Sequence, residues 1–289
     1  MKTLRETIEE FHSNNKAIGH FNVSNIEMIR AVAGAVRATN LPVIIGVSEG
    51  ERDVFGVSEI VAIVRIMREV HGLPVYLNAD HTYSVERVRE AIDAGFDSVV
   101  FDGARLSLEE NIAKTKECVV YAREKGGTTL IEGELGFIGA GSQLLDAIPE
   151  GAAVTEDLMT STHEAKHFVE ETGVELLAPA VGTVHGMMKS GNNPRINSER
   201  IREIASVVDI PLVLHGGSGT SEDEYREAIV NGIAQVHVST ELRVAYKRSL
   251  QLSLQENPEE LAPYKYTKQA ILSVQDIIEQ RMRLFAGLA

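Results

Sequence analysis

Short apolar segments alternate with amphipathic helical segments along the whole chain, and this alternation restricts the fold more than any other feature. The apolar segments are rich in β-branched residues and are short, as buried parallel strands are. Strands that alternate with helices indicate βα units and a parallel sheet. Eight segments are predicted to be strands: 17–22, 42–47, 74–79, 98–101, 128–135, 175–181, 211–215 and 234–238.

Helical patterns lie after each of these strands, at 26–39, 57–70, 85–94, 108–124, 163–171, 198–207, 222–230 and 241–255. Together they predict an α/β fold of the (β/α)8 TIM-barrel type. A doubly wound open sheet uses similar units, but no Gly-rich dinucleotide-binding turn follows the first strand and no break in composition divides the chain. The 289 residues suit one barrel, so we expect 1–289 to form a single domain.

Two further helices and one long loop are expected around the barrel. A helix near 4–14 should close the bottom, and a helix near 266–284 should lie outside the barrel or against another subunit. The connection 136–162 is far longer than the usual βα loop of ~2–6 residues. Loops of that length are functional lids or are disordered.

The charge of the chain restricts its partners. With 28 Lys and Arg against 42 Asp and Glu, the net charge is −14, which argues against nucleic acid or an anionic membrane as a partner. The sequence has no apolar run of ~18 residues that could span a bilayer and no signal peptide at its start. The single cysteine, Cys118, cannot form an internal disulfide and fits a reducing compartment. A soluble cytoplasmic protein is expected.

Four of the nine histidines follow or close predicted strands: His81, His185, His215 and His237. In a barrel, catalytic residues sit at the carboxyl ends of the strands, so these side chains should converge. Three convergent imidazoles with one open position are typical of a catalytic zinc site. Separately hydrogen-bonded core histidines are the alternative, which the convergence disfavours. His20 lies within the first strand and is expected in the core.

Carboxylates fall at the same predicted mouth. Asp80 precedes His81, and neighbours in an extended segment face opposite ways, so one could face a metal and the other the substrate. Asp102 closes the fourth strand, while Glu132 and Glu134 share one face of the fifth. A buried carboxylate is costly unless it is paired or binds a cation. For Asp102, metal-related roles and a salt bridge within the barrel are equally open.

Gly-rich turns follow the sixth and seventh strands, at 182–191 and 215–220. Backbone N–H groups in such turns can cradle an anion, and barrels often bind phosphate at their last loops. Lys189 adds a positive charge in the first turn. The second turn, HGGSGT, could also be an ordinary tight turn, but its place beside a proposed metal ligand favours phosphate binding.

Several motifs resemble those of one known family. The segments are HFNVSN (20–25), NADH (78–81), EGELG (132–136), VGTVHG (181–186), LVLHGGSG (212–219) and VHVSTE (236–241). In their order and spacing they resemble the class II, zinc-dependent fructose-bisphosphate and tagatose-bisphosphate aldolases. The resemblance covers nearly the whole chain. It implies cleavage or formation of a ketose (bis)phosphate such as fructose 1,6-bisphosphate, with dihydroxyacetone phosphate and an aldehyde such as glyceraldehyde 3-phosphate.

The resemblance also implies roles for individual residues. His81, His185 and His215 would bind Zn²⁺, Glu134 and Asp102 would take part in an alternative or inner metal position, and Asp80 would exchange a proton with the C4 hydroxyl of the ketose. A monovalent cation often accompanies the zinc. Phosphate and dihydroxyacetone contacts would come from Asn22, Ser48, Gly186, Lys189, Gly216, Gly217, Ser218, Ser239 and Thr240.

Two departures from the family pattern matter. Family members usually carry an acidic cluster in the loop after strand five, whose glutamate handles the proton at the carbanion carbon. Here Gly141 and Ser142 stand in that place, so the role is vacant or has moved to Asp146 or Glu150. The second departure is His237, where the family usually has asparagine. Its imidazole could be a substitute base, a neighbour of the metal site, or a selector for a different sugar.

Other activities remain open from the sequence. A barrel of this kind could instead be a metal-dependent hydrolase or epimerase, or a catalytically inactive relative that binds sugar phosphates. The trailing helix makes a homodimer or homotetramer an expected state.

Overall fold

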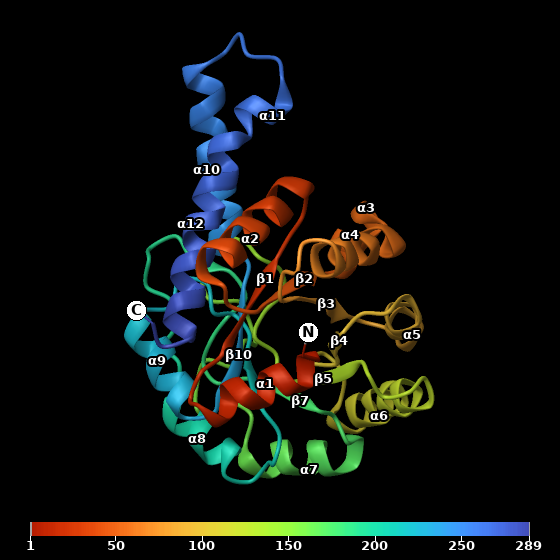
Figure 1. The fold of residues 1–289 in the computed structure, drawn as a ribbon. Coiled ribbons are helices and arrows are strands. Elements are labelled where there is room, and N and C mark those ends of the chain that lie inside the picture. The colour runs from red at the N-terminus through yellow and green to blue at the C-terminus, as the bar shows by residue number, and fades with distance from the viewer. Residues whose placement is uncertain (1, 289) are drawn as a thin grey trace.

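The protein is described by a computed structural model over residues 2–288. Its centre is a closed barrel of parallel strands (Figure 1). Around the barrel the strands run β1-β10-β9-β7-β5-β4-β3-β2, so successive strands of the barrel are neighbours. The predicted (β/α)8 TIM-barrel is confirmed. The strands are β1 (Ile18–Asn22), β2 (Val43–Val47), β3 (Val75–Thr82), β4 (Ser98–Phe101), β5 (Leu130–Leu135), β7 (Leu176–Pro179), β9 (Leu212–Leu214) and β10 (Ile233–Val238).

Helices form the layer outside the barrel (Figure 1). Several begin at a serine whose hydroxyl accepts the N–H three residues on, while a glutamate at that third position accepts the N–H of the serine. Ser107 with Glu110 and Ser221 with Glu224 are such capping boxes. The predicted helices are present as α2 (Ile26–Thr39), α4 (Val57–Glu69), α5 (Val85–Ala94), α6 (Leu108–Glu124), α7 (Thr162–Thr172), α8 (Ser198–Ala205), α9 (Glu222–Val230) and α10 (Thr240–Glu256).

The leading helix, α1 (Leu4–Ser13), closes the bottom of the barrel as predicted. Its Leu4 and Ile8 are buried in an apolar cluster with side chains from the first residues of the strands. These strand residues include Ile18, Ile44, Tyr76, Leu130, Leu176, Val213 and Ala234. Apolar side chains therefore fill the bottom of the barrel, at the amino ends of its strands.

The long connection after β5 carries a small sheet that the sequence did not reveal. β6 (Leu144–Leu145) pairs in parallel with β8 (Met187–Met188), which lies in the Gly-rich turn after β7. The pairing fastens the long connection to the neighbouring loop. Strands of two residues have no periodicity that a sequence could display.

The last helices lie partly along the barrel and partly beyond it. α12 (Lys268–Phe285) packs along α2 and α10, and buries Val274 and Ile278. α10 and α11 (Pro263–Tyr266) project beyond the barrel at the top of Figure 1.

A short helix that was not predicted, α3 (Glu49–Phe55), follows β2. Within residues 2–288, no helix combines the length and apolar character that crossing a membrane requires.

Candidate active site

A pocket opens at the carboxyl ends of the barrel strands, where the sequence placed the site. Most of the predicted site residues line it. These are Asn22, Ser48, Asp80, His81, Asp102, Glu134, His185, Gly186, His215, Gly216, Gly217, Ser218, His237, Ser239 and Thr240.

The backbone at His81 is unusual. Its φ of +37° lies in the left-handed region, and the register between β3 and β4 shifts between Ala79 and Thr82. In a regular strand, Asp80 and His81 would face opposite sides. Because of the shift and the positive φ, both side chains line the pocket. A non-glycine residue with such a φ is uncommon and is often found at functional sites.

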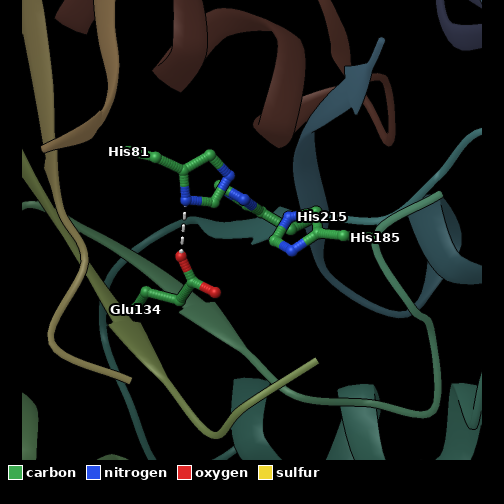
Figure 2. Close-up of side chains that lie close together, drawn as sticks. All are labelled: His81, Glu134, His185 and His215. Carbon is green, nitrogen blue, oxygen red and sulfur yellow. Dashed lines mark ion pairs between the residues drawn. The ribbon is translucent and has the colours of Figure 1, made fainter. Parts of the chain in front are cut away.

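Three imidazoles and one carboxylate meet in the pocket (Figure 2). His81, His185, His215 and Glu134 each offer one nitrogen or oxygen, and these four atoms lie within 4.8 Å of one another. His81 comes from β3, His185 from the loop after β7, His215 directly follows β9, and Glu134 belongs to β5. Residues far apart in the sequence thus form one cluster, as the barrel prediction required.

Hydrogen bonds fix one nitrogen of each ring. Nδ1 of His185 lies 3.0 Å from the carbonyl oxygen of Gly139, so it carries the proton. Nε2 of His215 lies 2.7 Å from Oε1 of Glu132, and Nδ1 of His81 lies 2.9 Å from Oδ2 of Asp102. In His185 and His215 the other nitrogen is left with its lone pair, and in His81 Nε2 is the nitrogen that is not bonded to Asp102. Partners that fix a tautomer in this way are typical of metal-binding histidines.

Within residues 2–288, Nδ1 of His215 is buried without a hydrogen-bond partner, and Oε2 of Glu134 is buried with only an ion-pair contact of 3.2 Å to Nδ1 of His81 (Figure 2). Leaving a buried lone pair unsatisfied costs about 1–3 kcal/mol, and a cation would satisfy both atoms. The donors are imidazole and carboxylate, which suit Zn²⁺ and other transition metals. The residues therefore fit a divalent metal ion.

The protonation states agree with this conclusion. Burial lowers the pKa of His185 to about 4 and also lowers the pKa of His215, so both rings are neutral near pH 7. Burial, with the nearby Asp102 charge, raises the pKa of Glu134 to about 7. Burial disfavours the charged form of His81, but Asp80 and Glu134 outweigh it and raise its pKa. A bound metal ion would take the place of the extra proton that Asp80 and Glu134 favour on the His81 ring.

Asp80 is held from two sides at the edge of the cluster. Its Oδ2 accepts a hydrogen bond of 2.8 Å from Nδ2 of Asn22, and its Oδ1 lies 3.3 Å from Nδ1 of His237. Burial opposes ionisation of Asp80, but His81 and His237 outweigh burial and lower its pKa. The carboxylate is therefore ionised near neutral pH and can accept a proton.

His237 belongs to a stack of rings inside the barrel. It lies over His20 with ring centroids 3.5 Å apart and over His215 with centroids 4.0 Å apart. His20 is fully buried, as expected for a core residue, and its Nε2 lies 3.0 Å from Oδ1 of Asn78. Nε2 of His237 lies 2.6 Å from the side-chain nitrogen of Gln235. Because that amide nitrogen is a donor, the proton of His237 belongs on Nδ1, toward Asp80.

The Gly-rich turn after β9 forms one wall of the pocket. Gly216 has φ +67°, and a Cβ placed there would come within 2.6 Å of the carbonyl oxygen of Val184, so only glycine fits. The Ser218 hydroxyl accepts the backbone N–H of Ser239 at 3.2 Å, which links this turn to the start of α10. Helix N-termini and exposed backbone N–H groups attract anions, which suits the phosphate site that the sequence suggested.

Three predicted site residues lie elsewhere. Lys189, Asp146 and Glu150 are exposed and are absent from the lining of the pocket. Nζ of Lys189 instead binds Oδ2 of Asp146 at 2.7 Å on the surface. The pairing of β6 with β8 aligns the two loops so that Lys189 and Asp146 meet outside the mouth. Their proposed roles in proton transfer and phosphate binding would require movement of both loops.

Sequence reasoning missed several charged residues near the pocket. Arg52 is buried and donates hydrogen bonds to the carbonyl oxygens of Val47 and Asp80, at 2.8 and 3.3 Å. Arg105 and Arg243 line the pocket. The capping-box spacing of Ser48 and Glu51 signals α3, which carries Arg52, and would have placed this arginine next to the mouth.

The fold and the site define a barrel enzyme with a candidate metal centre. The family model described as fructose-bisphosphate aldolase class-II matches residues 2–287. The chain belongs to this family, and the resemblance found in the motifs is confirmed. It is therefore a lyase of the aldolase type. Family membership thus favours an aldolase over the other activities that the sequence left open, namely a hydrolase, an epimerase or an inactive relative.

Individual relatives agree over nearly the full length. A fructose-bisphosphate aldolase of Staphylococcus aureus is 35% identical over 286 residues, 98% of this chain and 96% of the relative. A 6-phospho-5-dehydro-2-deoxy-D-gluconate aldolase of Bacillus licheniformis is 33% identical over 288 residues, 99% of this chain and 94% of that one. The crystal structure of the YdjI aldolase from Escherichia coli K12 superposes with a TM-score of 0.81 and 29% identity, covering 98% of this chain and 96% of that one.

Proposed function

We propose that the protein is a zinc-dependent aldolase that cleaves or forms a ketose phosphate, with dihydroxyacetone phosphate as one partner. The observation that carries this proposal is the convergence of His81, His185, His215 and Glu134 within 4.8 Å. Three imidazoles with room for a further ligand suit catalytic zinc, and Asp102 orients His81 beside it. When bound, the metal would supply a Lewis acid that stabilises negative charge on the ketose oxygens as the C3–C4 bond breaks.

The residues of the chain would perform the remaining steps. In the cleavage direction, Asp80 accepts the proton of the C4 hydroxyl, the C3–C4 bond breaks, and the electron pair stays on C3 of the dihydroxyacetone phosphate half. The C4 oxygen becomes the carbonyl of the departing aldehyde, and C3 then takes up a proton. General base help of this kind contributes ~10²–10⁴ in rate. Phosphate of the ketose would lie on the Gly216–Ser218 turn and on Ser239 and Thr240, which line the same pocket.

The named relatives support a sugar-phosphate substrate without fixing which one. One relative is named for fructose bisphosphate and another for 6-phospho-5-dehydro-2-deoxy-D-gluconate. Fructose 1,6-bisphosphate, with glyceraldehyde 3-phosphate as the aldehyde product, is the first substrate to test. We also propose that the protein is cytoplasmic, since the buried thiol of Cys118 fits a reducing compartment. A single-domain chain, a homodimer or homotetramer, and a monovalent cation beside the zinc are further parts of the proposal.

A cleavage screen tests the proposal. Purified protein is stripped with a chelator, reloaded with zinc, and given fructose 1,6-bisphosphate, tagatose 1,6-bisphosphate and fructose 1-phosphate. Release of dihydroxyacetone phosphate from at least one of them, lost with the chelator and restored by zinc, is the expected result. Parallel reloading with manganese and magnesium tests the metal. If the zinc-loaded protein releases no dihydroxyacetone phosphate from any ketose phosphate, the proposal is wrong.

A further inference from the structure

Arg105 lies at the mouth of the pocket with its guanidinium held over an aromatic ring. It follows β4 and is exposed, and it lines the same pocket as His81 and His185. Its guanidinium carbon lies 4.7 Å from the ring centroid of Phe137, which follows β5 and also lines the pocket. A guanidinium stacked in this way keeps its N–H groups free at the edge, because the contact uses only its flat face.

The charge of Arg105 is not neutralised by the protein. The other arginine of the lining, Arg243, donates to Oε1 of Glu51 at 2.6 Å. The nearby Glu49 accepts the backbone N–H of Tyr83 at 2.9 Å. Among residues 2–288, by contrast, no hydrogen bond or ion pair engages the Arg105 side chain. A fixed guanidinium without a carboxylate partner is suited to bind an anionic group of a ligand, with two parallel N–H donors.

The order of the strands places Arg105 opposite the proposed phosphate turn. In the barrel order β1-β10-β9-β7-β5-β4-β3-β2, β4 lies four places from β10 in either direction. Ser239 and Thr240 follow β10, and Arg105 follows β4. The histidine cluster lines the same pocket. A ligand with its phosphate at the β10 side that crosses the cluster therefore points its other end toward Arg105.

We propose that Arg105, steadied by Phe137, forms a subsite for an anionic group on the aldehyde half of the substrate. The group is a phosphate or a carboxylate, since both match the two N–H donors of a guanidinium. The inference rests on the proposed aldolase function and deepens it: the aldehyde partner carries a negative charge at the end remote from its carbonyl. Arg105 selects the aldehyde and takes no part in breaking the C–C bond.

The test measures aldol addition of dihydroxyacetone phosphate to three aldehydes by zinc-loaded protein. Glyceraldehyde 3-phosphate carries a phosphate, succinic semialdehyde a carboxylate, and glyceraldehyde no charge. For Arg105→Ala we expect KM to rise about 10- to 100-fold for the anionic aldehyde that the wild type prefers, the range of a lost hydrogen-bonded charge. KM for glyceraldehyde and for dihydroxyacetone phosphate should be unchanged. Arg105→Lys should recover part of the loss.

Arg65→Ala is the matched control, because Arg65 is exposed on α4 and does not line the pocket. It should leave all constants unchanged. A selective effect with glyceraldehyde 3-phosphate alone assigns the subsite to phosphate, and one with succinic semialdehyde alone assigns it to carboxylate. An equal rise of KM for the neutral aldehyde, or no rise for either anionic one, overturns the inference while the aldolase proposal stands. If the wild type adds dihydroxyacetone phosphate to none of the three, the aldolase proposal itself fails.

Discussion

Nδ1 of His237 lies 3.3 Å from Oδ1 of Asp80, deep in the barrel mouth. The Gln235 amide nitrogen faces the opposite ring nitrogen at 2.6 Å and keeps the proton on Nδ1. Asn22 donates to the other oxygen of the same carboxylate. This geometry favours a positioning role for His237, which was not among the roles expected from the sequence: the ring orients the carboxylate proposed to accept the substrate proton.

His237→Ala should therefore lower kcat more than it changes KM. Loss of this neighbour of a buried carboxylate should cost about 1.5–3 kcal/mol, which corresponds to a fall in kcat of roughly 10- to 100-fold. His237→Asn places an amide donor at the same position and should retain more of the activity. Steady-state kinetics with zinc-loaded protein give both constants. An unchanged kcat in His237→Ala would remove this residue from the support of Asp80.

His81 and Asp80 are adjacent in the chain, but substitutions at the two positions should separate metal binding from catalysis. His81→Ala removes one of the four convergent ligand atoms, so both zinc content and activity should be lost. Asp80→Ala should keep zinc and lose activity, because its carboxylate is not among those four atoms. Zinc measured by elemental analysis, together with a cleavage assay, separates the two. His163→Ala, on the exposed surface of α7, is the control. Full zinc content in His81→Ala would exclude that residue as a ligand.

The loop acids Asp146 and Glu150 were candidates for the base that handles the proton at the carbanion carbon. Both are exposed and outside the pocket lining, whereas Ser142 lines the pocket and its hydroxyl contacts that of Ser239 at 2.9 Å. We therefore expect Asp146→Ala and Glu150→Ala to keep exchange of the dihydroxyacetone phosphate C–H proton with solvent. Proton NMR in deuterated water measures this exchange. Its loss in one variant would show that the loop moves to bring that acid to the substrate.

The barrel could be predicted from the sequence because each of its main strands and helices has a recognisable local sequence pattern. Periodicity and caps give the elements, and a closed barrel then brings His81, His185 and His215 to one mouth without further information. What escaped prediction depends on contacts between distant segments. The positive φ of His81 accompanies a register shift against β4, and the site of Asp146 depends on the pairing of β6 with β8. Neither leaves a trace in the local pattern.

Arg52 supports the site from below. It is 1% exposed, and besides the two carbonyl oxygens it donates to Oγ1 of Thr82 at 3.0 Å. Arg52→Met keeps the volume but leaves the carbonyls of Val47 and Asp80 without their donor, so the free energy of unfolding should fall by about 1–3 kcal/mol for each group left unpaired. Chemical denaturation measures the change. Arg65→Met, on the exposed face of α4, should leave the stability unchanged. A stable Arg52→Met protein would mean that water replaces the guanidinium.

The stability of the protein at alkaline pH tests whether the Cys118 thiol is buried. The thiol is fully buried in α6, and burial raises its pKa from 9.0 to about 12. Below pH 9 the thiol is protonated in the folded and the unfolded chain, so it adds no pH dependence. Between pH 9 and about 12 the unfolded chain loses this proton first. It then binds fewer protons than the folded chain, so the free energy of unfolding falls as pH rises.

Cys118→Ala should remove this contribution, so its free energy of unfolding should decline less steeply above pH 9 than that of the wild type. Denaturant titrations at a series of alkaline pH values compare the two slopes. A thiol reagent should also leave the native protein unmodified below pH 9 and react once denaturant exposes α6, because the thiolate is the reactive form. Equal slopes, together with rapid labelling of the native protein, would mean that α6 opens readily and exposes Cys118 to solvent.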